Sequence, residues 1–391
     1  MSAEMPFKRT NKLLDEFWTN LKKTAGWTIS SNIIHGFQGA LQHAYGYAKD
    51  LNESLNNIRI VTGQSTDQMA KFAKQANEAA KSLSTTTTAY TNASLIYYQQ
   101  GLSDKEVMER TEVTVKMANA AGVSAETVSD QLTSVWNNFY DGSKSLEYYA
   151  DVMTALGAAT ASSTDEISEG LEKFSSVAST IGLSYEYATA SLATITATTR
   201  ESANVVGTAL KTLFSRIQGL QLGETLDDGT TLNKYSEALN KVGINIFDQN
   251  NQIKEMDDIL DEMGDKWGSL AQDQKMALAQ TVAGVRQYTQ LITLMDNWDY
   301  FQENLATATG ATGALDQQAD IYAESWDAAS KRVQASAEGI YDALLNDEFF
   351  IKLTNLGADV LDFTKQFIDS MGGVEGLLLS IGTIASRIFS K

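Results

Sequence analysis

The sequence predicts an all-α protein, and three observations support this. Proline occurs once in 391 residues, at Pro6, so almost nothing along the chain interrupts a helix. Apolar residues recur every three or four positions over long stretches, which is the period of an amphipathic helix. Short Gly-x-Ser phrases separate these stretches. We therefore expect an array of amphipathic helices joined by short Gly-x-Ser breaks, with a small loop or hairpin insert near 220–252.

Each Gly-x-Ser break combines a stop for one helix with a start for the next. Glycine can take the left-handed conformation that ends a helix, and serine can cap the following helix. An acid two or three residues later would face the positive end of the helix dipole. The breaks lie at 63–65, 101–103, 122–124 and 182–184, and the acids are Asp67, Glu106, Glu126 and Glu186. Their unequal spacing predicts a helical array and not a regular solenoid.

Apolar residues between the breaks form single stripes at helical spacing. Two serines, Ser103 and Ser163, also have a glutamate three residues later, which is the spacing of a capping box. The stripes comprise Ile167, Leu171, Phe174, Ala178 and Ile181; Val206, Leu210, Leu213 and Ile217; Ile253, Met256, Leu260, Met263, Trp267 and Leu270; and Leu353, Leu356, Val360, Phe363 and Phe367.

One region departs from this helical pattern. Residues 219–233 are polar and contain an Asp228-Gly229 turn, and residues 243–253 alternate between apolar and polar stretches. The sequence therefore divides into five parts. We expect a helical lead-in over 1–62, a core helical domain over 63–218, a polar loop or hairpin insert over 219–252, a second helical part over 253–345, and an amphipathic segment over 346–391 that continues in a longer native protein.

Composition argues against several functional classes. The net charge of −19 and the pI near 4.5 oppose sequence-independent binding to phosphate backbones, and we expect no sequence-specific nucleic-acid partner. There is no cysteine, hence no disulfide or thiolate chemistry. The N-terminal 24 residues lack the apolar run of a signal peptide, and no stretch reaches the roughly 18 apolar residues of a membrane-spanning helix.

We predict no catalytic, cofactor-binding or metal-binding residues. The only histidines, His35 and His43, lie eight residues apart without the further ligands of a zinc site. The Gly-x-Ser phrases lack the second glycine of a nucleophile elbow, and residues 227–229 lack the alternating ligands of a calcium loop. Five tryptophans are expected to anchor helix packing: Trp18, Trp136, Trp267, Trp298 and Trp326.

Several phrases along the chain, in their order and spacing, resemble the core of phage tail tape measure proteins, especially those of phages and prophages of Gram-positive bacteria. The resemblance covers about 45–345. The phrases are Asp50-Leu51-Asn52, Ile60-Val61-Thr62-Gly63, Gly101-Leu102-Ser103, Tyr149-Ala150-Asp151-Val152-Met153, Gly207-Thr208-Ala209-Leu210-Lys211, Val242-Gly243-Ile244 and Ala283-Gly284-Val285-Arg286-Gln287.

This resemblance implies a structural role, without enzyme activity or a cofactor. Tape measure proteins occupy the tail lumen of the virion, set the tail length, and support tail assembly and genome ejection. The implied partners are tail tube and baseplate or tail-tip proteins, tail assembly chaperones, further copies of the chain in a homo-oligomer, and the host membrane during ejection. The implied locations are the tail lumen and, during assembly, the host cytoplasm.

Two other functions stay open at the level of sequence. A membrane-acting helical protein, such as a pore-former, is suggested by the apolar C-terminal segment around Leu377, Leu378 and Leu379. A cell-wall hydrolase is the second alternative, because the many carboxylates could supply the acid pair of a glycosidase.

Overall fold

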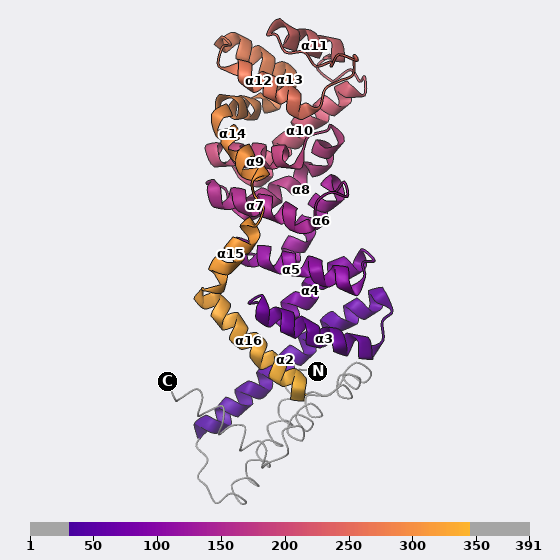
Figure 1. Ribbon diagram of the computed structural model, residues 1–391, viewed down its shortest axis with the longest axis vertical. Helices are drawn as coiled ribbons and strands as arrows, with labels where there is room; N and C mark the ends of the chain where they lie inside the picture. Colours follow the sequence, from indigo (N-terminus) through magenta and orange to yellow (C-terminus); the bar gives the residue numbers. More distant parts are fainter. Residues whose placement is uncertain (1–30, 345–391) are drawn as a thin grey trace, which may run out of the picture. The chain divides into compact units, whose positions relative to one another are not determined.

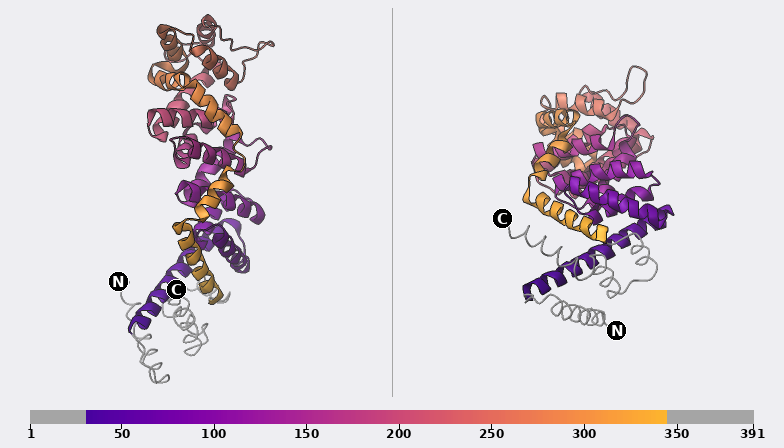
Figure 2. Two further views of the ribbon diagram at one scale, coloured as in Figure 1. Left: turned by 60° about the vertical axis from the view of Figure 1, so that its left-hand side comes forward. Right: turned by 60° about the horizontal axis from the view of Figure 1, so that its bottom comes forward.

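The computed structural model describes residues 31–344 (Figures 1 and 2). Over this range the chain forms fifteen α-helices and no β-strand, which confirms the predicted all-α fold. An isolated antiparallel bridge joins Phe247 and Ile253. The stripe that begins at Leu353 and the segment around Leu377 lie outside the described residues.

The chain divides into two compact units. Unit 1 combines 1–108 with 323–391, and unit 2 spans 109–322. The first unit is therefore assembled from two stretches far apart in the sequence. The five-part division along the sequence stays a prediction.

Unit 1 contains α2 (Ser31–Thr62), α3 (Thr66–Ser82), α4 (Thr87–Gln99) and α16 (Trp326–Leu344). Helix α2 packs on α4, and α16 packs on α3. Large side chains fill the interior, among them Leu51, Ile58, Tyr90 and Tyr97.

Polar contacts connect α16 to the N-terminal helices. The Asn77 side-chain amide donates to Thr87 Oγ1 (2.8 Å) and to the Ala335 carbonyl (2.9 Å). The Thr87 amide donates to Glu338 Oε2 (2.8 Å), so a buried carboxylate from α16 satisfies the N-terminus of α4. The bonds to Ala335 and Glu338 join residues about 250 positions apart.

Unit 2 begins within α5 (Asp104–Ala121) and contains ten further helices. Helix α8 packs most extensively on α10, and it also contacts α6 and α9. Helix α14 returns along α9 and α7 (Figure 1). The ten are α6 (Ala125–Phe139), α7 (Leu146–Ala159), α8 (Thr164–Thr180), α9 (Tyr185–Thr199), α10 (Ala203–Gln221), α11 (Leu232–Lys241), α12 (Met256–Trp267), α13 (Gln272–Asp296), α14 (Trp298–Thr309) and α15 (Ala314–Ala323).

The four predicted breaks are confirmed. Their glycines all have the positive φ that suits a residue without Cβ: 68° at Gly63, 76° at Gly101, 73° at Gly122 and 76° at Gly182. The amide of the following apolar residue donates back into the finished helix at three breaks, as in Leu183 to the Ala178 carbonyl (3.0 Å).

The serines of the breaks cap the following helices. Glu106 accepts from the Ser103 amide (2.9 Å) while its own amide donates to Ser103 Oγ (3.4 Å), which confirms the predicted capping box. The box at Ser163 and Glu166 is confirmed in the same way. At Ser65 the capping box is completed by the side chain of the neutral Gln68. Asp67, the acid that the sequence analysis named for this break, is not part of the box.

Three predicted stripes fall in unit 2: two are buried throughout, and the third, from Ile253 to Leu270, is buried except at these two end residues, which are half-buried. From Ile167 to Ile181, every member of the first stripe is at most 4% exposed, and the stripe from Val206 to Ile217 is at most 2% exposed. Since these two stripes lie on α8 and α10, the helical period correctly identified the faces that meet in the most extensive contact of the unit.

The predicted insert over 219–252 is confirmed in part: it contains a loop after α10 and an antiparallel turn that joins Phe247 to Ile253, but it also contains helix α11, which the sequence analysis did not predict. Thr231 caps this helix by accepting from the Lys234 amide, and Tyr235 and Leu239 form a buried i, i+4 pair. Gly243 then ends it with φ of 79°. A capping residue, a buried apolar pair and a terminal glycine also marked the other helices. They were overlooked here because the residues on both sides of α11 are polar.

Candidate functional site

The residues considered for chemistry do not come together. His43 is exposed on α2, and His35 belongs to the same helix, with its side chain outside the described set. Across 31–344, no group of three or more histidines, aspartates or glutamates is placed to hold a metal ion. Within the same residues, none of the helices combines the length and apolarity needed to cross a bilayer.

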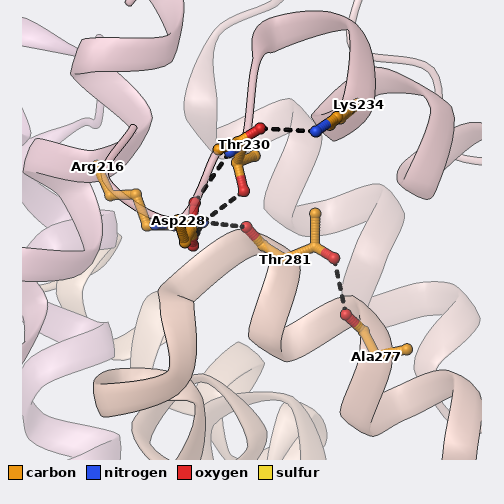
Figure 3. A network of polar contacts seen from close by, with 7 residues as sticks. Arg216, Asp228, Thr230, Lys234, Ala277 and Thr281 are labelled. Carbon is orange, nitrogen blue, oxygen red and sulfur yellow. Dashed lines mark hydrogen bonds and ion pairs between the residues drawn. The ribbon is translucent and has the colours of Figure 1, made fainter. Parts of the chain in front are cut away.

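Asp228 lies in the turn predicted from the sequence, and it also takes part in a polar network centred on Arg216 of α10 (Figure 3). Arg216 Nη2 pairs with Asp228 Oδ2 (2.6 Å) and donates to Thr230 Oγ1 (3.0 Å). The same nitrogen lies 3.3 Å from the Thr281 carbonyl of α13. One guanidinium thus connects α10, the loop before α11, and α13.

The loop itself is closed by short-range bonds. The Thr230 amide donates to Asp228 Oδ1 (3.0 Å), and the Leu226 amide donates to the Thr230 carbonyl (2.9 Å). Lys234 Nζ, from α11, donates to the Gly229 carbonyl (2.8 Å). Burial alone would raise the pKa of Asp228, but the hydrogen bonds from Thr230 and the nearby Arg216 charge outweigh it and lower that pKa.

Helix α13 bends where it passes Arg216. Gly284 has φ of 75° and ψ of 168°, a conformation that is essentially restricted to glycine. A Cβ at this position would lie 3.5 Å from Arg216 Nε and Nη1. The Arg216 side chain, 14% exposed, therefore lies against the bend, and the network can hold α13 in its two-segment form.

Helices α8 and α10 cross in unit 2 at two glycines, Gly170 and Gly207. A Cβ on Gly207 would lie 2.5 Å from the Gly170 carbonyl oxygen and 3.1 Å from Gly170 Cα. A Cβ on Gly170 would meet Leu192 side-chain carbons at 2.6 and 2.8 Å. Gly207 begins one of the phrases that carried the family resemblance. Packing explains the glycine in this phrase, because only glycine allows the two backbones to approach this closely.

A second such phrase contributes a buried cap. Asp151 on α7 is 3% exposed, and its carboxylate accepts from the amides of Gly313 (3.0 Å) and Leu315 (2.8 Å). These amides belong to the N-terminal turn of α15, where a negative charge is favourable. Asp151 therefore fixes the start of α15, the last helix of unit 2. The position of Asp151 in the middle of an apolar helix did not reveal this role.

Helix α12 presents acids to α9 and α14. Asp257 accepts from the Ser184 amide (3.1 Å), and Asp261 accepts from the Tyr187 hydroxyl (3.1 Å) and from the Gln302 amide (3.4 Å). Burial raises the pKa of Asp261 and outweighs these two hydrogen bonds. Burial and the neighbouring Asp261 carboxylate also raise the pKa of the Tyr187 hydroxyl. These hydrogen bonds connect α12 to the N-terminal turn of α9 and to α14.

The tryptophans follow the prediction in part. Trp267 is 2% exposed and donates its indole N–H to Asp296 (2.7 Å), and Trp298 covers Gly264 so closely that no Cβ would fit there. Trp136 stacks on Tyr140. For Trp326 the prediction is wrong: this side chain is 89% exposed. Trp18 lies outside the described residues.

These features define a helical structural protein whose characteristic residues serve helix capping, helix crossing and polar joints. Comparison with known families agrees: residues 73–284, more than half of the chain, match phage-related minor tail proteins. The chain belongs to this family and is a phage tail protein, hence a component of the virion. The match ends at Gly284, the bend beside Arg216. No solved structure matches the chain.

Proposed function

We propose that the chain is a tail tape measure protein, which acts through its length and through assembly. Membership of the minor tail protein family carries this proposal. It is supported by the series of short phrases that resemble tape measure cores, two of which, around Asp151 and Gly207, have defined structural roles in unit 2. The role needs no reaction chemistry.

Under this proposal the protein lies in the tail lumen of the virion, after a stage in the host cytoplasm during assembly. Its partners are the tail tube, the baseplate or tail tip, tail assembly chaperones and other copies of the chain. During genome ejection it leaves the tube and contacts the host membrane.

Helix geometry limits how much length this chain can measure. A fully extended helix rises about 1.5 Å per residue, so 391 residues could span at most roughly 590 Å. The capped breaks fold the described helices back on one another, so the folded form measures less per residue. A ruler would therefore reach its full length by opening contacts such as the α8–α10 crossing.

A graded insertion series tests this proposal. The loop at 141–144 is exposed and can accept added residues at low cost. Helical inserts of about 20, 40 and 80 residues should lengthen the tail by up to about 30, 60 and 120 Å, in whole tube rings. Tail lengths are measured by electron microscopy.

Two controls make the series decisive. Scrambled inserts of the same lengths and helix propensity should lengthen the tail equally, since a ruler responds to length and not to sequence. Inserts with a helix-breaking sequence should change the tail length by a different amount per added residue. Complete tails of wild-type length throughout the series would overturn the proposal and would leave this region as an assembly module.

A further inference from the structure

Helix α13 folds back on itself at a single residue. Gly284 lies at its midpoint, with twelve residues on either side, and it is the residue at which the helical conformation is interrupted. At the open end, Lys275 Nζ of the first half lies 3.2 Å from Asp296 Oδ1 of the second half, and Asp296 also accepts from the Trp267 indole N–H (2.7 Å). In a straight helix Lys275 and Asp296 would lie roughly 30 Å apart, so the bend brings the far ends of the two halves together. We call this contact of Lys275, Trp267 and Asp296 the clasp.

A second contact holds the bend itself. In a continuous helix the Thr281 carbonyl would accept from the amide of Val285, four residues later. Here Arg216 Nη2 of α10 donates to the Thr281 carbonyl (3.3 Å), and the same nitrogen pairs with Asp228 Oδ2 (2.6 Å) (Figure 3). The guanidinium therefore supplies a donor to a carbonyl that a straight helix would satisfy from within, and Asp228 keeps it there.

The sequence after the bend carries no start signal for a new helix. The Gly-x-Ser breaks supply a serine that caps the next helix, whereas Gly284 is followed by Val285, Arg286 and Gln287. None of these three is a capping type, and Gly284 has no side chain that could accept a hydrogen bond. Local signals therefore favour one continuous helix of 25 residues, and tertiary contacts impose the bend.

The buried residues of α13 suit the folded-back form. They are Leu278, Ala279, Val282 and Ala283 in the first half, and Leu291, Leu294 and Met295 in the second half. At about 100° of rotation per residue, the centres of these two sets lie roughly 140° apart around a straight helix. The bend therefore allows both halves to be buried in the same unit.

The same helix also contains the stripe of a straight form. Leu278, Val282, Val285, Thr289 and Ile292 follow one another at steps of four, three, four and three residues, which places them along one face of a continuous helix. The folded-back form breaks this stripe and leaves Val285 70% exposed. Two apolar patterns thus overlap in α13, one for each form.

We propose that α13 is an extensible helix: release of the clasp and of the Arg216 contact converts its folded-back halves into one continuous helix. Each half of twelve residues spans about 18 Å, and the continuous helix spans about 37 Å. The folded-back form is the resting state, because its two buried faces and both contacts stabilise it. Extension adds length to the protein without adding residues. For that use the inference rests on the proposed tape measure function.

Gly284→Ala tests the bend through the backbone alone. A Cβ at this position would lie 3.5 Å from the nearest Arg216 atoms, an ordinary contact. Alanine disfavours the φ and ψ of Gly284, so the helical conformation should gain on the order of tenfold or more in population. Gly122→Ala is the matched control: Gly122 also has a positive φ (73°) and space for a Cβ, but Ser124 caps the helix that follows it.

Spin labels report the length of α13 in the full purified chain. Cysteines replace Gln272 and Thr289, which are exposed on the two halves, and the chain has no other cysteine. A straight helix separates these positions by about 26 Å along its axis. We expect a single shorter distance without the alanine, and an added population at the long distance with Gly284→Ala. Hydrogen exchange at the amides of Val285 and Arg286 should slow, because both regain helical acceptors.

Lys275→Gln tests the clasp without changing the backbone. Loss of the ion pair with Asp296 should also raise the population at the long distance. Lys211→Gln, at an exposed lysine of α10, removes the same charge elsewhere in unit 2 and should leave the distances unchanged. This pair of variants decides the question if Gly284→Ala does not fold.

Two outcomes would overturn the proposal. Unchanged short distances in the folded Gly284→Ala and Lys275→Gln chains would mean that α13 is a fixed pair of helices. Faster exchange at Val285, or an equal response of the Gly122 and Lys211 controls, would mean local unfolding and not extension. These measurements need only purified protein, so their failure is distinct from a failure of the tail-length experiment.

Discussion

Replacing Gly207 with alanine should destabilise unit 2 by forcing α8 and α10 apart. The added methyl would lie 2.5 Å from the Gly170 carbonyl oxygen and 3.2 Å from its carbonyl carbon. Both atoms belong to the backbone of a buried helix, so no side chain can rotate out of the way. The helices must separate by a few tenths of an ångström or more along their most extensive contact.

The magnitude follows from two opposing effects. Overpacking a well-packed interior costs about 1–3 kcal/mol. Alanine is a better helix former than glycine by about 0.5–1 kcal/mol, which offsets part of this cost. We expect a net loss of about 1–2 kcal/mol, equivalent to about 2–8 °C in melting temperature for a unit of this size.

Gly46→Ala provides the matched control. Gly46 also lies inside a helix, α2, but a Cβ there would meet nothing within 4 Å. The same chemical change should therefore stabilise the chain by about 0.5–1 kcal/mol. The assay is urea unfolding followed by circular dichroism, with both variants measured beside the wild type. A Gly207→Ala chain as stable as Gly46→Ala would refute the close crossing of α8 and α10.

Three further predictions concern caps and carboxylates. Ser103→Ala should cost about 1 kcal/mol in urea unfolding, because the amide of Glu106 loses its acceptor; an unchanged midpoint would contradict the capping role. Asp151→Ala leaves two amides of the α15 turn without their buried acceptor, and we expect a loss of about 1–3 kcal/mol with faster proteolysis near Gly313; equal cleavage of variant and wild type would argue against this cap. Because the folded-state pKa of Asp261 is raised, its ionisation lowers stability as the pH rises through that pKa, and the penalty is absent below the ordinary carboxyl value of about 4. Asp261→Asn keeps an acceptor for Tyr187 and should gain stability over the wild type as the pH rises from about 4 to 7; a pH profile of stability parallel to that of the wild type would exclude the raised pKa.

The sequence by itself determined the helical class, the breaks between helices and the apolar face of each helix. These properties are local. A cap such as Ser103 with Glu106 depends on two residues that lie three positions apart. A stripe such as that from Ile167 to Ile181 depends on the geometry of a single helix. The missed helix α11 follows the same rules, and its cap at Thr231 could have been found from the sequence.

Tertiary structure alone decided which of these faces meet and which remain open. Asn77 bonds to Ala335 across more than 250 residues, and Arg216 reaches Asp228 and α13, because the folded chain brings them together and no sequence period records such distances. The contrast between Trp267 and Trp326 has the same origin. Both occupy apolar positions on amphipathic helices, but among the described residues only the first is covered by a neighbouring helix, whereas the second is exposed.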